Sequence, residues 1–454
     1  MGILTESVVG FLQGTALERA PEKSLALAAN GFTDCVAVML AGYDEPVTRH
    51  IFQHIENTGG IPMSRCLLGK KRATVAQSTL VGVGAAHALD FDDYAYSNHV
   101  SALLVPAILA EAERTPCSGS DLLRAYLAGF EVWAAVMKRE PDHLHSKGWH
   151  PTGVFGAIGV AAALSWLRGL NAQQTRNALG LAAANGGGVM DNFGSQAKSY
   201  QGARAAEAGV TCTELALAGV DAGPNAIDGG GGLLAALSPF GNADLESPAD
   251  WLGSHWVSAD DSLNIKMHPT VGASQRSIDA AIQLHRDTAP DIAGITEIIV
   301  RVSEKHAAVM RFHKPTTALE AKFSAEFGVA AALIAGKVGL AEVSDEFVEH
   351  PDVQALIRKV KLEIGPDNDP DYPVGAVTDT VAYRSGDGTW IESEPVHRFR
   401  GHGQNPMSNL EFLQKFLDCV APGYGESTAR SLFGLLQAIG DLESVDDIPA
   451  LTPL

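Results

Sequence analysis

Residues 90–99 form the first group whose types and spacing could do chemistry. The segment reads DFDDYAYSNH and follows a long apolar stretch, so three carboxylates, two tyrosines and a histidine stand close together in the chain. Such neighbours can supply acid and base groups with divergent pKa values. The alternative is a solvated helix end followed by a loop. Asp90 and Asp93 are also three residues apart, but no HxxxH pattern or DxNxD calcium loop accompanies them, so we predict no metal site.

A second group precedes a helix start near residue 151. His143, His145, Lys147 and His150 lead into PTG at 151–153 and then into an apolar run. Such a proline ahead of an apolar run is typical of a helix N-terminus. The positive end of the helix dipole favours a neutral imidazole at His150, and a neutral imidazole can act as a general base or a polarising donor. For His143 and His145 the alternative is a surface loop.

A third group surrounds Lys198. The segment GGGVMDNFGSQAKSYQGAR covers residues 186–204, so a loop of small residues delivers the lysine just before a helix that looks buried. The chain has 33 Lys and Arg against 53 Asp and Glu, a formal net charge of −20. In so acidic a protein, a lysine at this place could hold a substrate carboxylate or act as a base with a depressed pKa. The alternative is an ordinary surface lysine.

The charge balance and several missing motifs disfavour other classes of protein. A net charge of −20 repels nucleic acid and anionic membranes. The four glycines at 229–232 are not followed by a P-loop lysine, no GxGxxG follows an expected strand and no GxSxG is present, which disfavours nucleotide cofactors and serine hydrolases. The five cysteines form no CxxC pair, and the start MGILTESVVG lacks the basic residues of a secretory signal. We therefore expect a cytoplasmic protein with reduced thiols and no membrane or nucleic-acid partner.

The elements that must position these groups are helices over the first 265 residues. Apolar residues recur at three- and four-residue spacing in a series of segments. These segments span 24–40, 77–89, 105–113, 121–138, 153–167, 175–185 and 202–218. Ser118 precedes one of them as a capping-type residue. Small residues at helical spacing in GVFGAIGVAAA, 153–163, predict helices packed very close together deep in a bundle.

The pattern changes after residue 265. Alternating runs predict strands at 294–302, 360–364, 376–383 and 390–392, with helices at 274–285, 324–334 and 344–349 between them. Helical spacing returns at 410–420 and 427–438. We therefore predict a mainly α fold in three sections: a large all-α helical-bundle domain over 1–265, an inserted smaller α+β domain over 266–400, and C-terminal helices over 401–454 that return to the bundle.

A series of short motifs runs through nearly the whole chain. They are HALDFDD at 87–93, HVS at 99–101, VPA at 105–107, WHPTG at 149–153, GARAA at 202–206 after the Lys198 loop, KMHP at 266–269, AKFS at 321–324 and NPMS at 405–408. Each motif alone is weak, but as an ordered set they resemble the MmgE/PrpD family. This family includes 2-methylcitrate dehydratase, cis-aconitate decarboxylase and iminodisuccinate epimerase.

The resemblance implies a large all-α domain with a smaller α+β lid, usually in a homodimer that needs no cofactor. It also implies active-site positions at Asp90, His99, His150 and Lys198. Each reaction of the family creates or consumes charge at a carbon beside a carboxylate, which requires a base within hydrogen-bond reach and cations over the carboxylate. A small anionic carboxylate is therefore the expected substrate.

Three departures from the dehydratase and decarboxylase pattern direct the choice among the family's activities. Tyr94 replaces the threonine usual after DFDD, and Gln201 replaces a histidine usual three residues after the loop lysine. Val271 replaces the histidine or cysteine usual just after the KxxP proline. The three replacements change polar residues of the site but keep the expected base and the lysine cation. This combination favours an epimerase, because epimerisation has no leaving group. The sequence also looks closest to iminodisuccinate epimerase.

We therefore predict a cofactor-independent epimerase of a dicarboxylic amino compound of the iminodisuccinate type, acting by α-proton abstraction and reprotonation. The alternatives are a hydro-lyase of the 2-methylcitrate dehydratase type or a related decarboxylase of a tricarboxylic acid, and, in a different class, a non-catalytic dimer that binds small acids. Lys198 and His150 would transfer protons. The expected catalytic residues are Lys198, His150, Asp90, Tyr94 and His99. The expected substrate contacts are Lys266, His268, Arg204, Asp93 and Tyr96.

Overall fold

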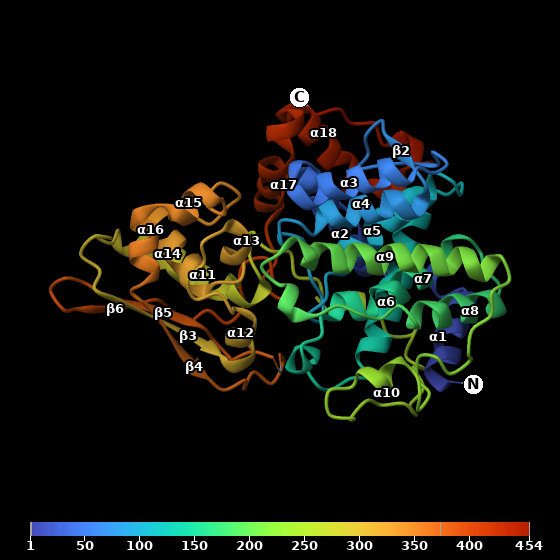
Figure 1. Ribbon diagram of the computed structural model, residues 1–454, viewed down its shortest axis with the longest axis horizontal. Helices are drawn as coiled ribbons and strands as arrows, with labels where there is room; N and C mark the ends of the chain where they lie inside the picture. The colour runs from blue at the N-terminus through green and yellow to red at the C-terminus, as the bar shows by residue number, and fades with distance from the viewer. Residues whose placement is uncertain (1, 373, 454) are drawn as a thin grey trace.

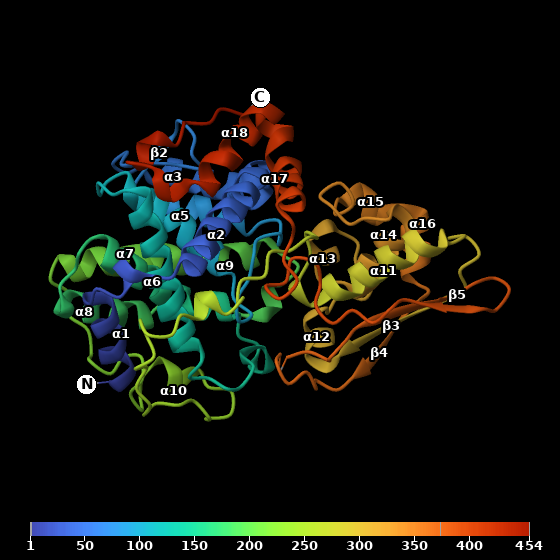
Figure 2. The same ribbon diagram turned by 180° about the vertical axis from the view of Figure 1, so that it is seen from behind.

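The computed structural model describes residues 2–372 and 374–453, and its fold is mainly α. Figures 1 and 2 show a large helical part beside a smaller part in which helices cover a sheet. The helical part contains α1 (Ile3–Gln13), α2 (Glu22–Ala41), α3 (Pro46–Thr58), α4 (Val75–Ala86), α5 (Val100–Ala112), α6 (Gly119–Met137), α7 (Pro151–Leu167), α8 (Ala172–Ala183), α9 (Gln196–Leu217), α10 (Leu233–Leu237), α17 (Asn409–Tyr424) and α18 (Glu426–Gln437), with a short hairpin of β1 (Ser64–Arg65) and β2 (Arg72–Ala73).

The central helices begin and pack as their residue patterns predict. The Ser118 hydroxyl accepts from the backbone N–H of Asp121, and the Asp121 carboxylate accepts from the N–H of Ser118, so the predicted start of α6 is confirmed. α7 begins at Pro151, as expected for a proline in the first turn. The close packing predicted for α7 is also confirmed, because a Cβ added at Gly159 would lie 2.4 Å from the Trp133 ring.

Several predicted helix limits are wrong. α9 begins at Gln196, six residues before the predicted start, because the Ser195 hydroxyl accepts from the backbone N–H of Ala197 and caps the helix there. Lys198 therefore lies inside α9 and not in the loop before it.

α5 begins at Val100, five residues before the predicted start, and contains Pro106 inside the helix. All of its side chains are buried, so packing of this apolar segment outweighs the missing N–H of the proline. α4 ends at Ala86 and not at residue 89, because the following loop turns sharply and Asp90 has a left-handed backbone with φ +51.

The smaller part is built on a four-stranded sheet with the order β4-β3-β5-β6. β3 (Glu297–Ser303) pairs in parallel with β4 (Val360–Gly365) and antiparallel with β5 (Thr380–Arg384), which pairs antiparallel with β6 (Trp390–Glu392). Alternate residues of β3 are buried, and they share an apolar cluster with α11 and α14. The helices of this part are α11 (Gln275–Thr288), α12 (Glu304–Val309), α13 (Ala318–Ala321), α14 (Ala325–Ala335), α15 (Asp345–Glu349) and α16 (Pro351–Ile357).

The described residues form two large apolar clusters and one small one. The first large cluster joins residues from 4–265 with residues from 416–451, and α17 packs against α2 (Figure 2). The second lies within residues 273–383. The small cluster contains Met190, Phe193, Val309 and Phe323, so it joins the two parts. The domain limits at 265 and 400 stay predictions.

One described segment, Glu22–Asp44, is long and apolar enough to cross a membrane by length and composition. However, 72% of its most apolar stretch is buried inside the protein. Packing within the helical part therefore accounts for its apolar character.

Candidate active site

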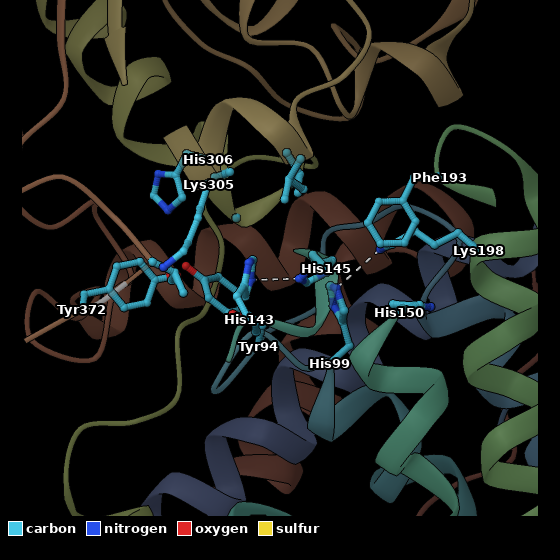
Figure 3. Close-up of a pocket in the computed structure, with 16 residues that line it drawn as sticks. Tyr94, His99, His143, His145, His150, Phe193, Lys198, Lys305, His306 and Tyr372 are labelled. Atoms are coloured by element: carbon cyan, nitrogen blue, oxygen red, sulfur yellow. Dashed lines mark hydrogen bonds between the residues drawn. The ribbon is translucent and has the colours of Figure 1, made fainter. Parts of the chain in front are cut away.

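A cavity between the two parts collects histidines, lysines and tyrosines from distant segments (Figure 3). Its empty space, including the open mouth, is about 600 Å³. Figure 3 shows Lys198 and Lys305 toward opposite ends of the cavity. The wall contains Tyr94, Ser97, His99, His143, His145, His150, Phe193, Lys198, Val271, Gly272, Ala273, Lys305, His306, Val309, Tyr372 and Val374.

Asp90 binds two lysines at one end of this cavity. Its Oδ1 accepts from Lys198 Nζ at 3.0 Å and from Lys266 Nζ at 2.8 Å. The Lys266 side chain is completely buried, whereas Lys198 lines the cavity. Burial favours the neutral form of Asp90, but the ammonium groups of Lys198 and Lys266 outweigh burial and hold the pKa of Asp90 well below its usual range. Burial lowers the pKa of Lys198 although Asp90 opposes this, so Lys198 gives up a proton more readily than a lysine in water.

Asp92 fixes the hydrogen positions of two imidazoles. Its carboxylate accepts from His99 Nδ1 at 2.7 Å and from His87 Nδ1 at 3.1 Å. Burial opposes the charge of Asp92, but the two imidazoles hold its pKa well below the usual range, so Asp92 can only accept hydrogen bonds. The hydrogen of His99 therefore lies on Nδ1, and the lone pair of its Nε2 faces Lys198 Nζ at 3.4 Å. This arrangement provides a proton acceptor, His99, beside a proton donor, Lys198.

Buried lysines from distant segments hold the loop that follows α4. Lys322 Nζ donates to the Ala88 carbonyl at 2.9 Å, and Lys415 Nζ donates to the Phe91 carbonyl at 3.0 Å. Lys266 Nζ donates to the Asp90 carbonyl at 2.6 Å. These carbonyl groups lie beyond the negative end of the α4 dipole, which favours cations. The three contacts explain how Asp90 keeps its unfavourable left-handed backbone.

The α+β part supplies three polar wall residues that the sequence analysis did not select. They are Lys305, His306 and Tyr372. Lys305 and His306 lie in α12, directly after β3, and Lys305 Nζ lies 3.7 Å from Asp367. Burial lowers the pKa of His306 to about 3. In the sequence, the sign of these residues was the polar pair Lys305 and His306 shortly after the predicted strand at 294–302. Ligand-binding residues are common in such a place, but this sign is weak by itself.

Six of the residues expected from the sequence come together here. Asp90, His99, His150 and Lys198 lie at or directly behind the wall, with Lys266 beneath them. Tyr94 also lines the cavity and is buried. Burial raises the pKa of Tyr94, so its phenol stays protonated at pH 7 and is not a proton acceptor.

Arg204 and His268 lie outside the cavity wall. The Arg204 guanidinium is about half exposed and donates to Glu207, one turn away on α9. His268 is buried, with Nε2 3.0 Å from Asp279 Oδ1 and Nδ1 3.1 Å from a backbone carbonyl. This geometry does not support the expected substrate contact for either residue, since their polar groups already have protein partners.

Asp93 and Tyr96 also lie outside the cavity wall. Asp93 is fully buried beside Asp34, and burial together with the Asp34 charge raises the pKa of Asp93 well above its usual value. Tyr96 lines a neighbouring cavity that contains several carboxylates, and the Lys138 ammonium lies 5.5 Å from its ring centre. Acidic surroundings disfavour an anionic ligand, so the expected carboxylate contact of Tyr96 also lacks support.

Four side chains are close enough to suggest a metal site. Donor atoms of His87, Asp90, Asp92 and His99 all lie within 4.8 Å of one another. However, the carboxylate of Asp90 is shared by two ammonium groups, and that of Asp92 accepts from two imidazole N–H groups. A metal ion would have to displace these cations and hydrogens. The absence of a metal site stays a prediction.

The pH dependence of any turnover by this site should show that the imidazoles of His99 and His145 are neutral. Burial lowers the pKa of His99 to about 3 and of His145 to about 3, so both rings are neutral well below the usual histidine value near 6.5. We expect kcat/KM to show no acid limb near pH 6.5, because neither ring gains a proton there. It should fall at alkaline pH below 10.5, where Lys198 loses its charge. A steady-state profile from about pH 5.5 to 10 checks this, and an acid limb near 6.5 would contradict it.

Comparison with known proteins corrects the predicted activity. The chain is 28% identical to cis-aconitate decarboxylase of Mus musculus over an alignment of 469 residues, gaps included. The alignment covers 99% of this chain and 93% of that protein. It is 27% identical to cis-aconitate decarboxylase of Homo sapiens, covering 82% and 77% of the two chains, and 25% identical to cis-aconitate decarboxylase of Aspergillus terreus, covering 85% and 81%. These relatives are lyases, so the prediction of an isomerase, an iminodisuccinate-type epimerase, is wrong. Their names favour the alternative, a lyase.

Two family profiles cover most of the sequence. One describes the MmgE/PrpD N-terminal domain and matches residues 6–246, which include the loop after α4, the start of α7 and Lys198. The other describes the MmgE/PrpD C-terminal domain and matches residues 268–437, which include Lys305 and Tyr372. Together they contain every named residue of the cavity wall, and the chain belongs to the MmgE/PrpD family.

Proposed function

We propose that this protein is a lyase that decarboxylates a tricarboxylic acid of the cis-aconitate type. The names of its relatives support this activity. The observation that carries the proposal is the combination of a buried lysine, Lys198, on the cavity wall with a neutral imidazole acceptor 3.4 Å away. Such a pair can hold a carboxylate and transfer a proton to the adjacent carbon.

The reaction needs one proton and no change of oxidation state. When the carboxylate of the carboxymethyl group leaves as CO2, the electrons of the broken C–C bond form a new double bond to the central carbon. The electrons of the old double bond move to the carbon beside another carboxylate, and this carbon takes a proton. We assign that proton to the Lys198 ammonium, which then recovers a proton from water. Each turnover therefore consumes one proton from water and releases one CO2.

The cavity also has suitable places for the other groups of such a substrate. Lys305 lies toward the end opposite Lys198, so two carboxylates of one molecule can meet separate cations. Phe193 and Val309 give the wall an apolar stretch between the two parts. We assign the departing carboxylate to this stretch, because poor solvation of its charge favours neutral CO2.

The α+β part is proposed to act as a lid over this site. Support comes from the wall itself, since residues of both parts line one cavity and a small apolar cluster joins them. Closure of such a lid would exclude water from the reacting carboxylates. The homodimer, the cytoplasmic location and independence of a cofactor stay predictions.

Proton NMR in deuterium oxide tests the function directly. Purified protein is incubated separately with cis-aconitate, 2-methylcitrate and iminodisuccinate. We expect cis-aconitate to give methylenesuccinate with one deuterium in its saturated CH2 group, the carbon beside a carboxylate, because the transferred proton comes from solvent. Dehydration of 2-methylcitrate with inert cis-aconitate would make the protein a hydro-lyase. Reaction of iminodisuccinate alone, or of none of the three, would overturn the proposal.

A further inference from the structure

We infer that Gln201 is a positioning residue that fixes the hydrogen of His150 on Nε2. Of the two roles that the sequence left open for His150, general base or polarising donor, this hydrogen position selects the donor, and the acceptor is a substrate carboxylate. This inference rests on the proposed function for the identity of the carboxylate, but the hydrogen position itself follows from the contacts of Gln201 in the ligand-free protein.

The orientation of the Gln201 amide is determined by two donors. Its Oε1 accepts from the backbone N–H of Val189 at 2.8 Å and from Asn192 Nδ2 at 2.7 Å. An amide nitrogen cannot accept these bonds, so the NH2 group must point the other way. There it lies 3.0 Å from His150 Nδ1 and also donates to the Val189 carbonyl at 3.3 Å.

An NH2 group has only hydrogens to offer, so His150 Nδ1 must be the acceptor. A neutral imidazole with an accepting Nδ1 carries its hydrogen on Nε2. Burial and the nearby Lys198 charge lower the pKa of His150 well below its usual value, which keeps the ring neutral. His150 also precedes the first residue of α7, where the positive end of the dipole disfavours a second proton.

The donating nitrogen has no hydrogen-bond partner among the described residues. His150 is only 2% exposed, and its Nε2 is a buried polar atom without such a partner. Its ring lines the cavity that also contains Lys198, with Phe193 packed edge-on at 5.1 Å between ring centres. A buried N–H without a partner is unfavourable, so a carboxylate oxygen that accepts from it gains affinity.

His99 and His150, two of the five histidines in the cavity wall, therefore have opposite hydrogen-bonding roles. Asp92 holds the hydrogen of His99 on Nδ1 and leaves a lone pair on Nε2, whereas Gln201 holds the hydrogen of His150 on Nε2. One ring accepts and the other donates, although both are neutral. This division assigns carboxylate binding to His150 and leaves proton transfer to the pair of His99 and Lys198.

The substitution Gln201→Glu tests this inference. A carboxylate at position 201 has nearly the same shape but can only accept, so the hydrogen of neutral His150 must move to Nδ1. We expect ¹⁵N NMR of the ligand-free protein to show a protonated Nε2 in the wild type and a protonated Nδ1 in Q201E. The His150 signals are identified by their loss in His150→Gln. With cis-aconitate at about pH 8.5, kcat/KM of Q201E should fall about 100-fold, the scale for loss of one positioned hydrogen-bond donor.

A lower pH should partly restore the activity of Q201E. The new carboxylate raises the pKa of His150, and an imidazolium carries hydrogens on both nitrogens. Turnover of Q201E relative to wild type should therefore rise as the pH is lowered, while a loss caused by local misfolding would stay constant. Gln196→Glu is the matched control: Gln196 lies on the same helix, 3.0 Å from His50 Nδ1 in an exposed pair outside the cavity, and should retain wild-type kinetics.

Several results would overturn the inference. One is a wild-type His150 protonated on Nδ1, and another is a Q201E protein that keeps the wild-type tautomer. An inverted tautomer with unchanged kcat/KM would remove the donor role. If the wild type does not act on cis-aconitate, the proposed function fails, but the NMR measurement still decides whether Gln201 fixes the tautomer.

Discussion

Replacing Lys198 with methionine is expected to lower kcat for cis-aconitate about 1,000-fold, within the range for loss of a positioned acid or electrostatic group. The change removes the proton donor and the cavity cation, whose Nζ lies 5.5 Å and 5.3 Å from the ring centres of Phe193 and Phe323, and replaces them with an uncharged, unbranched side chain. Asp90 keeps Lys266 as a partner, so its charge is not left alone in the interior. Initial rates of methylenesuccinate formation measure the effect.

Arg204→Ala is the matched control for this substitution. Arg204 is a cation on the same helix, but its guanidinium is exposed and paired with Glu207. An exposed pair of this kind contributes little, so the variant should have wild-type turnover and nearly wild-type stability. If K198M retained more than about a tenth of the wild-type rate while folded, Lys198 would not be the proton donor. Loss of activity in R204A would instead support the substrate contact that the sequence predicted for Arg204.

Replacing Asp92 with asparagine is expected to reduce kcat by about 1,000- to 10,000-fold, as when the carboxylate that orients a catalytic histidine is lost. Asp92 accepts from both His99 and His87, and the amide of asparagine offers a donor to one of them. A donor facing His99 Nδ1 moves its hydrogen to Nε2, where it meets the Lys198 ammonium. The lone pair that helps to hold the Lys198 ammonium in place is then lost. Steady-state kinetics with cis-aconitate measure the fall in kcat.

Asp93→Asn is the control, because it makes the same change at the neighbouring residue. The raised pKa of Asp93 means that its carboxyl favours the protonated form, which asparagine imitates in shape and charge. Asp93 also lies outside the cavity wall, so its variant should keep its rate to within a few-fold. Equal losses in both variants, with intact circular dichroism spectra, would show that a general disturbance of the loop and not the tautomer of His99 is responsible.

Local patterns and the family resemblance led to several parts of the site before the structure. The capping residues at Ser118 and the proline at 151 marked two helix starts, because both signals depend on backbone groups only a few residues away. The resemblance selected Asp90, His99, His150 and Lys198, and the fold brings these residues together. The resemblance also identified the family correctly. The departures at Tyr94, Gln201 and Val271, however, were interpreted as signs of an epimerase, which is the wrong activity.

The sequence by itself determined the mainly α fold, the alternation of helices and strands after residue 265, and the chemical types available for catalysis. Only the tertiary structure decided which of these groups meet. Lys198 and Asp90 are 108 residues apart, and Lys266 approaches the same carboxylate across 176 residues. Helical periodicity could not separate exposed Arg204 from buried Lys198, nor predict which nitrogen of His150 or His99 carries the hydrogen. These properties depend on burial and on hydrogen-bond partners from distant segments, and such contacts form only when the whole chain has folded.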